Sequence, residues 1–243
     1  MSDAYVKLSQ IELFTQSAEV AQTLGLYRLR DSYLDRARVE LKRRLSSTSD
    51  PESELIRWGY QLNLHYDLLR WSASKSSLKY RMPPELRDAR WWRLLYPNAY
   101  SEIVSHNSAR FRVPSELILS FIYKESAFRP RVISPAYAMG LMQLLEKTAQ
   151  ALHPDAPPPQ LTKPAENIKL GVEYLAMLSQ RFHGQLPIVA AAYNAGPQSV
   201  TRWLKLSDSR RIRELDRFVE LIPFKEAREY VKRLVALNCA YSL

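Results

Sequence analysis

Cysteine and glycine are scarce in this chain, and long apolar runs are missing from it. Its 243 residues include one cysteine, Cys239, which excludes a disulfide framework within the chain. Cys239 falls in the last helical pattern beside Val235 and Ala236, so we expect a small buried side chain there. No uninterrupted apolar stretch reaches the roughly 18 residues that a membrane-spanning helix needs, so the sequence predicts no such helix.

The scarcity of glycine also bears on the fold class. Only six glycines occur, alternating apolar runs are few, and many segments repeat apolar residues with a helical period, which predicts an all-α protein. A run rich in proline between His153 and Pro159 cannot be helical and predicts a long surface loop. The helical patterns cover residues 9–24, 26–45, 52–69, 113–128, 141–152, 166–182, 187–195, 198–206, 209–221 and 223–241.

Positive charge is in excess but is not concentrated. The chain has 35 Lys and Arg residues against 25 Asp and Glu, a formal net charge of +10. No polybasic tail is present, so the sequence does not indicate a nucleic-acid-binding arm. A diffuse positive field of this kind favours association with a polyanion.

Glu125 is a carboxylate where the helical pattern would place another hydrophobic residue. In the pattern over 113–128, which Pro114 opens, it follows Phe121 by four residues and Ile122 by three. A carboxyl group held against apolar surface has a raised pKa and can act as a general acid near neutral pH. A boundary glutamate that reaches solvent or pairs with an arginine is the alternative, and position alone favours that alternative.

Four sequence blocks in a fixed order favour the catalytic interpretation. They are Glu125-Ser126, Gly140-Leu141-Met142-Gln143, Ala192-Tyr193-Asn194-Ala195-Gly196 and the stretch 222–231, IPFKEAREYV. Their order and spacing resemble the catalytic domain of the soluble lytic murein transglycosylases, lysozyme-like enzymes that cut the glycan strands of peptidoglycan. The resemblance runs from Tyr96 to the C-terminus and implies a lysozyme-like helical catalytic domain over residues 96–243.

The first 95 residues are predicted to form a separate small helical domain. Ala21, Leu24 and Tyr27, followed by Ala37 and Leu41, form a pattern typical of paired-helix solenoid repeats. The region is also similar to the helical region that precedes the catalytic domain in long members of the family, where a Tyr-Pro-x-Ala-Tyr element marks the junction. The stretch 96–100, YPNAY, matches that element. Residues 91 and 92, both tryptophan, are better explained by packing at the junction than by sugar stacking.

The resemblance assigns Glu125 the catalytic role and gives other positions substrate-binding roles. Ser134 matches a serine that orients the acid, Tyr193 a tyrosine whose phenol reaches the catalytic carboxyl, and Asn194 an asparagine whose amide meets the sugar. Glu226 matches an acidic residue at the glycan groove, although a first-turn complement to the helix dipole explains it nearly as well. The substrate-binding positions are Ser134, Gly140, Met142, Gln143, Tyr193, Asn194 and Glu226.

The Gly-Leu-Met-Gln block contains three residues whose chemistry suits sugar binding. Gly140 allows a backbone to approach a sugar closely. Met142 offers an adaptable apolar wall, and Gln143 offers a neutral donor and acceptor for an N-acetyl group.

The number of candidate acids bears on whether the glycosidic bond would be cut by hydrolysis or by ring closure. Hydrolysis by the usual routes takes two carboxylates, and the only acid between Glu125 and Asp155 is Glu146, which we expect at the surface. Glu146 replaces the family's usual proline, which predicts an extended helix. The resemblance implies that one glutamate protonates the glycosidic oxygen and then, as a base, helps the muramic 6-hydroxyl close a 1,6-anhydro ring. A conventional muramidase and a wall-binding scaffold with a vestigial site are the alternatives.

The resemblance also implies the partners and the compartment. Peptidoglycan glycan strands are the expected substrate, and the N-terminal helices are candidates for contact with other cell-wall enzymes. His153 and His183 lack metal-ligand spacing, so we expect neither a metal nor a cofactor. The family implies a periplasmic or envelope location, whereas the first residues, MSDAYVK, lack the plan of a secretory signal. We therefore interpret the chain as a shortened form without its export signal.

Overall fold

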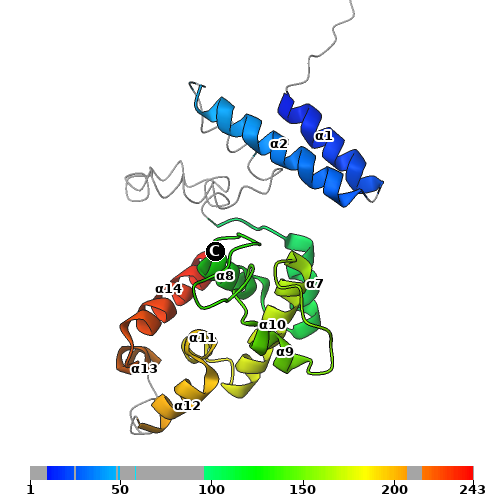
Figure 1. The fold of residues 1–243 in the computed structure, drawn as a ribbon. Coiled ribbons are helices and arrows are strands. Elements are labelled where there is room, and N and C mark those ends of the chain that lie inside the picture. The colour runs from blue at the N-terminus through cyan, green and yellow to red at the C-terminus, as the bar shows by residue number, and fades with distance from the viewer. Residues whose placement is uncertain are drawn as a thin grey trace, which may run out of the picture. The chain divides into compact units, whose positions relative to one another are not determined.

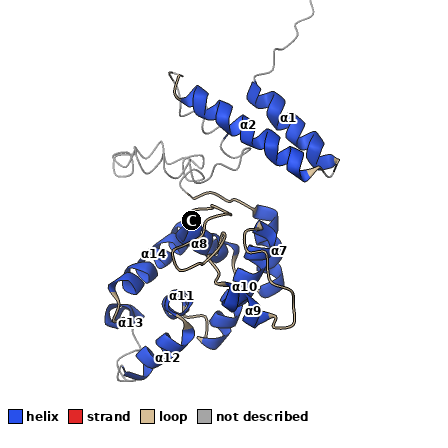
Figure 2. Cartoon of the chain, viewed as in Figure 1, coloured by secondary structure: helices blue, strands red, loops and turns tan. Residues whose placement is uncertain are grey.

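The structure, a computed structural model, is all-helical in the residues that it describes. These are residues 10–24, 26–47, 49, 58, 96–206 and 215–242. Within these ranges the only extended pairing consists of two isolated bridges, Ile133 to Met139 and Met139 to Leu144 (Figure 2). The predicted all-α class is confirmed, and none of the described helices is long and apolar enough to cross a membrane.

The chain divides into two compact units, Met1–Pro97 and Asn98–Leu243. In the first unit, α1 (Gln10–Thr23) packs against α2 (Tyr27–Leu45), as Figure 1 shows. Their contact is a small apolar core of Ile11, Ala37 and Leu41, joined by Trp58. The expected helix over 52–69, apart from Trp58, and the two tryptophans at 91 and 92 lie outside the described residues. The linker or solenoid-like nature of this unit therefore stays a prediction.

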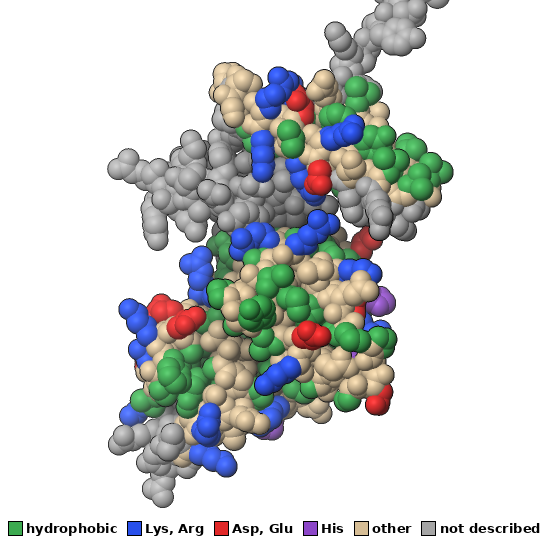
Figure 3. Space-filling view, viewed as in Figure 1, with side chains coloured by type: hydrophobic (Ala, Val, Ile, Leu, Met, Phe, Trp, Pro, Cys, Tyr) green, Lys and Arg blue, Asp and Glu red, His purple; other side chains and the backbone are tan. Residues whose placement is uncertain are grey.

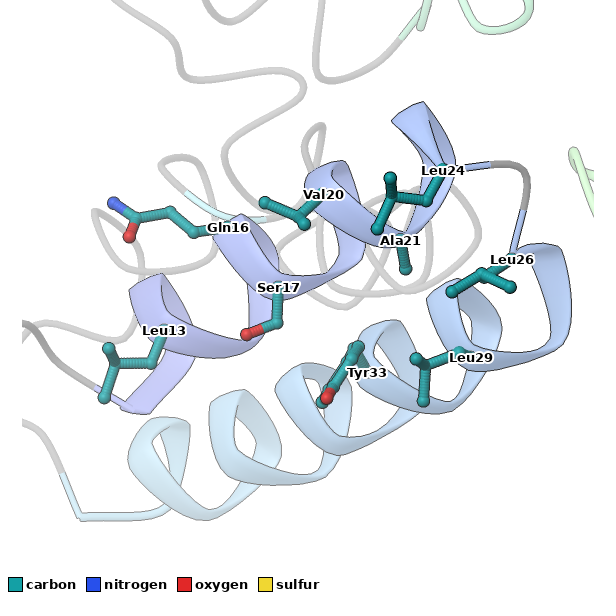
Figure 4. A pocket seen from close by; sticks show the side chains of 9 residues that line it. All are labelled: Leu13, Gln16, Ser17, Val20, Ala21, Leu24, Leu26, Leu29 and Tyr33. Carbon is teal, nitrogen blue, oxygen red and sulfur yellow. The ribbon is translucent and has the colours of Figure 1, made fainter.

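A second apolar surface of this helix pair is exposed. Leu13 and Val20 on α1, and Leu24 directly after it, are about half to two-thirds exposed. With Leu26 and Leu29 they line a groove of about 360 Å³, drawn in Figure 4. Stacked helix pairs present surfaces of this kind to their neighbours, which agrees with the repeat-like pattern in the sequence.

The second unit is built around α8. Ile118, Phe121 and Ile122 on this helix are fully buried, and α8 packs against α7 and α14. On the drawn face of the unit, Lys and Arg side chains are scattered instead of gathered in one patch (Figure 3). The helices are α7 (Ser101–Phe111), α8 (Ser115–Ser126), α9 (Glu146–Leu152), α10 (Pro164–Arg181), α11 (Leu186–Ala195), α12 (Pro197–Leu206), α13 (Leu215–Leu221) and α14 (Lys225–Tyr241).

The ends of α8 differ from the sequence expectation. Pro114 precedes the helix, and its carbonyl oxygen accepts hydrogen bonds from the N–H groups of Leu117 and Ile118. The helix ends at Ser126 because Ala127 and Phe128 both adopt the left-handed conformation, with φ of 48° and 63°. Glu125 therefore lies in the last turn of α8, directly before an irregular loop.

Two further expectations are corrected in this unit. The helix expected over 141–152 begins only at Glu146, because Met139 and Leu144 exchange backbone hydrogen bonds of 2.9 and 3.1 Å and hold the intervening residues in a turn. Glu146 is exposed, as expected, but it does not extend the helix. Cys239 is exposed, not buried, because α14 turns a different face to the core. That face carries Ala227, Tyr230, Val231, Leu234, Leu237 and Ala240.

Candidate active site

Glu125 is partly buried between α8 and α14. Tyr230 of α14 is 4% exposed and donates its phenolic hydrogen to Oε1 of Glu125. Burial raises the pKa of the Glu125 carboxyl to about 7, while the hydrogen bond from Tyr230 and the charge of Lys124 act in the opposite direction. A carboxyl group with this pKa can both donate and accept a proton near neutral pH.

Lys124 is linked to the same pair. Its ammonium nitrogen lies 4.6 Å from the centroid of the Tyr230 ring, a cation–π distance. Besides burial, the groups that shift the pKa of Glu125 are Tyr230 and Lys124, and neither of them is a carboxylate.

Aromatic rings form the wall next to this acid. Phe121, one turn before Glu125, lies 4.7 Å from the Tyr193 ring, centroid to centroid, and the Tyr174 ring lies 5.4 Å from that of Tyr193. The hydroxyl of Tyr193 donates a 2.8 Å hydrogen bond to the carbonyl oxygen of Met142. This corrects the expectation that the Tyr193 phenol reaches the catalytic carboxyl: the phenol bonded to Glu125 belongs to Tyr230.

The charge of Glu125 nevertheless acts on Tyr193. Burial first, and then the nearby Glu125 carboxylate, raise the pKa of the Tyr193 phenol well above its usual value. Tyr193 therefore stays protonated in the neutral range and keeps its hydrogen bond to Met142.

Asn167 of α10 connects the loop after α8 to the helical core. Its side chain is fully buried, and its Oδ1 accepts a 2.7 Å hydrogen bond from the N–H of Met142. Its Nδ2 donates to the carbonyl oxygens of Met139 and Leu161, each at 2.9 Å. The backbone that carries the Gly-Leu-Met-Gln block is thus held by one buried amide with three bonds.

Gly140 is required by this packing. Its φ is +79°, and a Cβ atom there would lie 2.1 Å from the Leu161 carbonyl oxygen and 2.4 Å from Nδ2 of Asn167. The close approach that needs glycine is therefore to Asn167 and Leu161, whereas the sequence suggested an approach to a sugar.

Met142 and Gln143 contribute to the site in different ways. The Met142 side chain is fully buried against Gly171 of α10, so the structure turns the expected apolar wall toward the core. Nε2 of Gln143 donates hydrogen bonds to the carbonyl oxygens of Val132 and Gly140, at 3.1 and 2.8 Å. Its Oε1 has no hydrogen bond to any described residue and can accept one from a ligand.

Three predicted binding residues lie at or near the surface. The hydroxyl of Ser134 accepts a 3.0 Å hydrogen bond from the N–H of Ala138 and, within the described ranges, forms none with Glu125. Asn194 and Glu226 are exposed, Asn194 at the end of α11 and Glu226 in the first turn of α14. Their substrate contacts stay predictions.

Two residues of the site escaped the sequence analysis. Tyr230 lies at helical spacing from Ala227 and Leu234, and a buried tyrosine hydroxyl needs a hydrogen-bond partner, so its position carried a usable signal. The position of Asn167 carried no such signal, because two of its three partners, Met142 and Met139, lie 25 and 28 residues earlier in an irregular loop.

Comparison with protein families identifies this unit. Residues 102–215 match the family model of the transglycosylase SLT domain. This segment is similar to the transglycosylase SLT domain, and the chain is similar to the soluble lytic murein transglycosylases. The chain is 36% identical over 152 residues to the soluble lytic murein transglycosylase of Escherichia coli (strain K12), which covers 60% of this chain and 23% of that protein.

A second relative gives the same result. The putative soluble lytic murein transglycosylase of Haemophilus influenzae is 36% identical over 155 residues, which is 62% of this chain and 26% of that protein. This chain thus spans about a quarter of the length of these relatives.

Solved structures agree with the SLT assignment. The 70-kDa soluble lytic transglycosylase from Escherichia coli superposes with a TM-score of 0.65 and 27% identity, covering 95% of this chain and 42% of that one. An inactive glutamate-to-glutamine mutant of the lytic transglycosylase Slt from Pseudomonas aeruginosa gives a TM-score of 0.63 and 25% identity, covering 94% and 35%. The predicted lysozyme-like helical fold is confirmed.

The hydrogen bond from Tyr230 to Glu125 predicts a change in pH dependence. Tyr230→Phe keeps the ring and the cation–π contact but removes a donor that stabilises the carboxylate, so the pKa of Glu125 should rise further. We expect the alkaline limb of the kcat/KM profile to move up by about one pH unit, since a hydrogen bond to a charged group contributes about 1.5 kcal/mol or more.

The control for this variant is Tyr174→Phe, which removes a phenol from the same aromatic cluster without touching Glu125. Its pH profile should match that of the wild type. Identical profiles for Tyr230→Phe and the wild type would show that the phenol does not act on the acid.

Removal of the Asn167 amide should destabilise the SLT domain strongly. Asn167→Ala leaves the Met142 N–H and two carbonyl oxygens without partners in a buried place, and we expect a loss of about 3 kcal/mol in the free energy of unfolding. Urea denaturation measures this loss. Asn194→Ala, which truncates an exposed amide, is the control and should change the free energy by less than about 0.5 kcal/mol. Equal effects of the two variants would contradict the role given to Asn167.

Proposed function

We propose that the chain is a peptidoglycan lytic transglycosylase that cuts the β-1,4 bond between N-acetylmuramic acid and N-acetylglucosamine. The observation that carries the proposal is a partly buried glutamate, in an SLT domain, whose pKa is raised to about 7 and whose carboxyl accepts a hydrogen bond from a buried tyrosine. In this proposal Glu125 is the only acid and base, and the product ends in a 1,6-anhydromuramoyl ring.

In the first step, protonated Glu125 gives its proton to the glycosidic oxygen as the bond from the muramic C1 to that oxygen breaks. N-acetylglucosamine leaves with a 4-hydroxyl group. The positive charge that develops at C1 is stabilised by the substrate's own acetamido group. Burial keeps Glu125 protonated at the start of this step.

In the second step, the Glu125 carboxylate takes the proton of the muramic 6-hydroxyl while its oxygen bonds to C1. The ring closes, Glu125 is again protonated, and no water is consumed. Between the two steps the carboxylate is stabilised by the Tyr230 donor and by the charge of Lys124. These two groups therefore support the state that the first step creates.

The surroundings of Glu125 favour this reaction over hydrolysis. A hydrolase of the usual kind pairs its acid with a second carboxylate about 5–10 Å away, and a second negative charge that close raises the pKa of the first. Among the described residues, the groups that shift the pKa of Glu125 besides burial are Tyr230 and Lys124, and neither is a carboxylate. The glutamate-to-glutamine mutant of the Pseudomonas aeruginosa relative is named inactive, which agrees with one essential glutamate.

The remaining assignments follow from the same proposal. Residues 96–243 are the catalytic domain, and the helices of residues 1–95 are a linker or solenoid-like domain that positions it on the wall; the two compact units of the structure, Met1–Pro97 and Asn98–Leu243, support this division. Ser134, Gln143, Asn194 and Glu226 contact the glycan. The substrate places the enzyme in the periplasm or envelope, where the first domain is available to other cell-wall enzymes.

Mass spectrometry of the products from purified peptidoglycan tests the proposal. Anhydromuramoyl ends support it, since only ring closure by the 6-hydroxyl produces them. Reducing ends would identify a muramidase. Absence of cleavage would identify a wall-binding scaffold.

Glu125→Gln should remove activity and change stability in a pH-dependent way. The amide cannot donate the proton, so we expect cleavage to fall about 10²–10⁴-fold. The carboxyl pKa is higher in the folded chain, about 7, than in the unfolded chain, about 4.3, so the wild type loses stability as pH rises between these values. The melting temperature of the variant relative to the wild type should therefore increase from pH 4.5 to pH 7 and stay constant above it.

The control is Glu146→Gln, which changes the only other acid between residues 125 and 155, an exposed one. It should keep full activity and show no such pH-dependent difference in melting temperature. Near-normal activity of Glu125→Gln with anhydro products would disprove the role of Glu125.

A further inference from the structure

Tyr137 lies at a position that is unfavourable for tyrosine in two respects, its exposure and its backbone conformation. Its side chain is 78% exposed, so the ring contributes little to the core. Its φ is +62°, in the left-handed region where glycine and asparagine are tolerated and bulky residues are strained. Backbone strain of this kind persists where the structure around it compensates or where function requires it.

Neighbouring residues with the same strain have a structural reason for it. Between residues 127 and 143, left-handed conformations also occur at Ala127, Phe128, Gly140 and Gln143. Ala127 caps the end of α8, with its N–H bonded to the carbonyl oxygen of Tyr123. Phe128 is 2% exposed, Gly140 packs against Asn167, and Gln143 clamps two carbonyl groups. Tyr137 has no comparable compensation: its ring has no aromatic partner, and its hydroxyl no hydrogen bond, within the described part of the chain.

The turn at Tyr137 forms without its side chain. The N–H of Ser134 donates to the carbonyl oxygen of Ala138, and the N–H of Tyr137 donates to that of Ser134, both at 2.9 Å. The Ser134 hydroxyl accepts from the N–H of Ala138 at 3.0 Å. Backbone groups and one serine therefore define the loop tip, and the tyrosine ring is free to contact a ligand.

The base of this loop is connected through hydrogen bonds and one ring contact to α8, the helix that carries Glu125. Gln143 and Gly140 both bond to the carbonyl oxygen of Val132, three residues before the proline that follows Ser134. Next to Gln143, Met142 accepts the hydrogen bond from Tyr193, whose ring lies against α8 one turn before the acid. Tyr137, at the tip of the loop, follows Val132 by five residues and precedes Gly140 by three, so the tip is connected to this base by short segments.

A second exposed apolar side chain occurs in the same loop. Ile133 is 55% exposed and lies directly before Ser134, where its backbone pairs with Met139. An exposed aromatic ring suits the C–H face of a pyranose ring, which is apolar although the sugar's hydroxyl groups are polar.

We propose that Tyr137 is a carbohydrate-binding residue whose ring stacks on a sugar of the glycan strand, away from the bond that Glu125 protonates. The inference rests on the proposed function for its substrate class, a β-1,4-linked glycan. Tyr137 is not a catalytic residue: it acts on the affinity for glycan and on which part of a strand is held.

Three substitutions in the full chain distinguish the effect of the Tyr137 ring on glycan binding from the effect of the turn's backbone conformation. Tyr137→Gly and Tyr137→Asn both remove the ring from a backbone conformation that they tolerate, and Tyr137→Phe keeps the ring. All three are made in the Glu125→Gln background, so that glycan is bound without being cut. Isothermal titration with an uncrosslinked peptidoglycan oligosaccharide of defined length measures Kd, and thermal unfolding measures stability.

We expect the glycine variant to melt a few degrees higher, because the left-handed strain is relieved, and yet to bind glycan about three- to tenfold more weakly. The asparagine variant should lose the same affinity, and the phenylalanine variant should restore it. A purely structural role would change melting temperature and leave Kd unchanged.

Two results would overturn the proposal. One is unchanged Kd in the glycine and asparagine variants, and the other is an equal loss in all three variants, which would assign the effect to the turn. Absence of any binding to the Glu125→Gln chain would overturn it as well. Failure of the proposed function is seen separately, as absence of cleavage products from the wild-type chain, while the comparison of Kd values stays decisive for Tyr137.

Discussion

The burial of one carboxyl group, that of Glu125, is the constraint on which the proposed chemistry of this protein depends. Glu125 sits at the end of α8, with buried apolar residues of its own helix behind it and Tyr230 of α14 in front of it. Burial favours the protonated form, while the phenol and the Lys124 charge favour the carboxylate, and their balance gives a pKa of about 7. A single acid with this pKa can both donate and accept a proton. In a glycoside hydrolase of the usual kind these two tasks are divided between two carboxyl groups.

The position of that carboxyl depends on contacts that never touch it. Asn167 holds the backbone of Met142, and Met142 accepts the hydrogen bond that fixes Tyr193. Tyr193 in turn lies against Phe121 on α8. The buried Asn167 amide thus fixes the aromatic wall of the candidate site relative to α10. Gly140 allows the loop to approach Asn167 closely enough for these bonds.

Helical periodicity in the sequence predicted the fold class and most of the helices. It did not predict features that depend on contacts between residues far apart in the chain. Helical spacing marks Glu125 as a carboxylate among apolar residues, and the order and spacing of the four blocks indicate the family and favour a catalytic role for this acid. Periodicity cannot show which phenol meets the acid, because Tyr230 and Glu125 are 105 residues apart. Nor could it show that α8 stops at Ser126 or that residues 141–145 form a turn, since both depend on left-handed residues and on the paired Met139 and Leu144. Cys239 was misplaced because adjacency to apolar residues was used in place of the buried face of α14.

The most direct test of this account is a carbon-13 NMR titration of the Glu125 carboxyl, assigned by comparison with the Glu125→Gln chain. We expect a midpoint near pH 7 and a second, smaller response at the Tyr230 ring carbons, because the phenol is bonded to the titrating group. A midpoint near the ordinary glutamate value of about 4.3 would contradict it. Glu125 would then be ionised at neutral pH and unable to start the reaction as an acid.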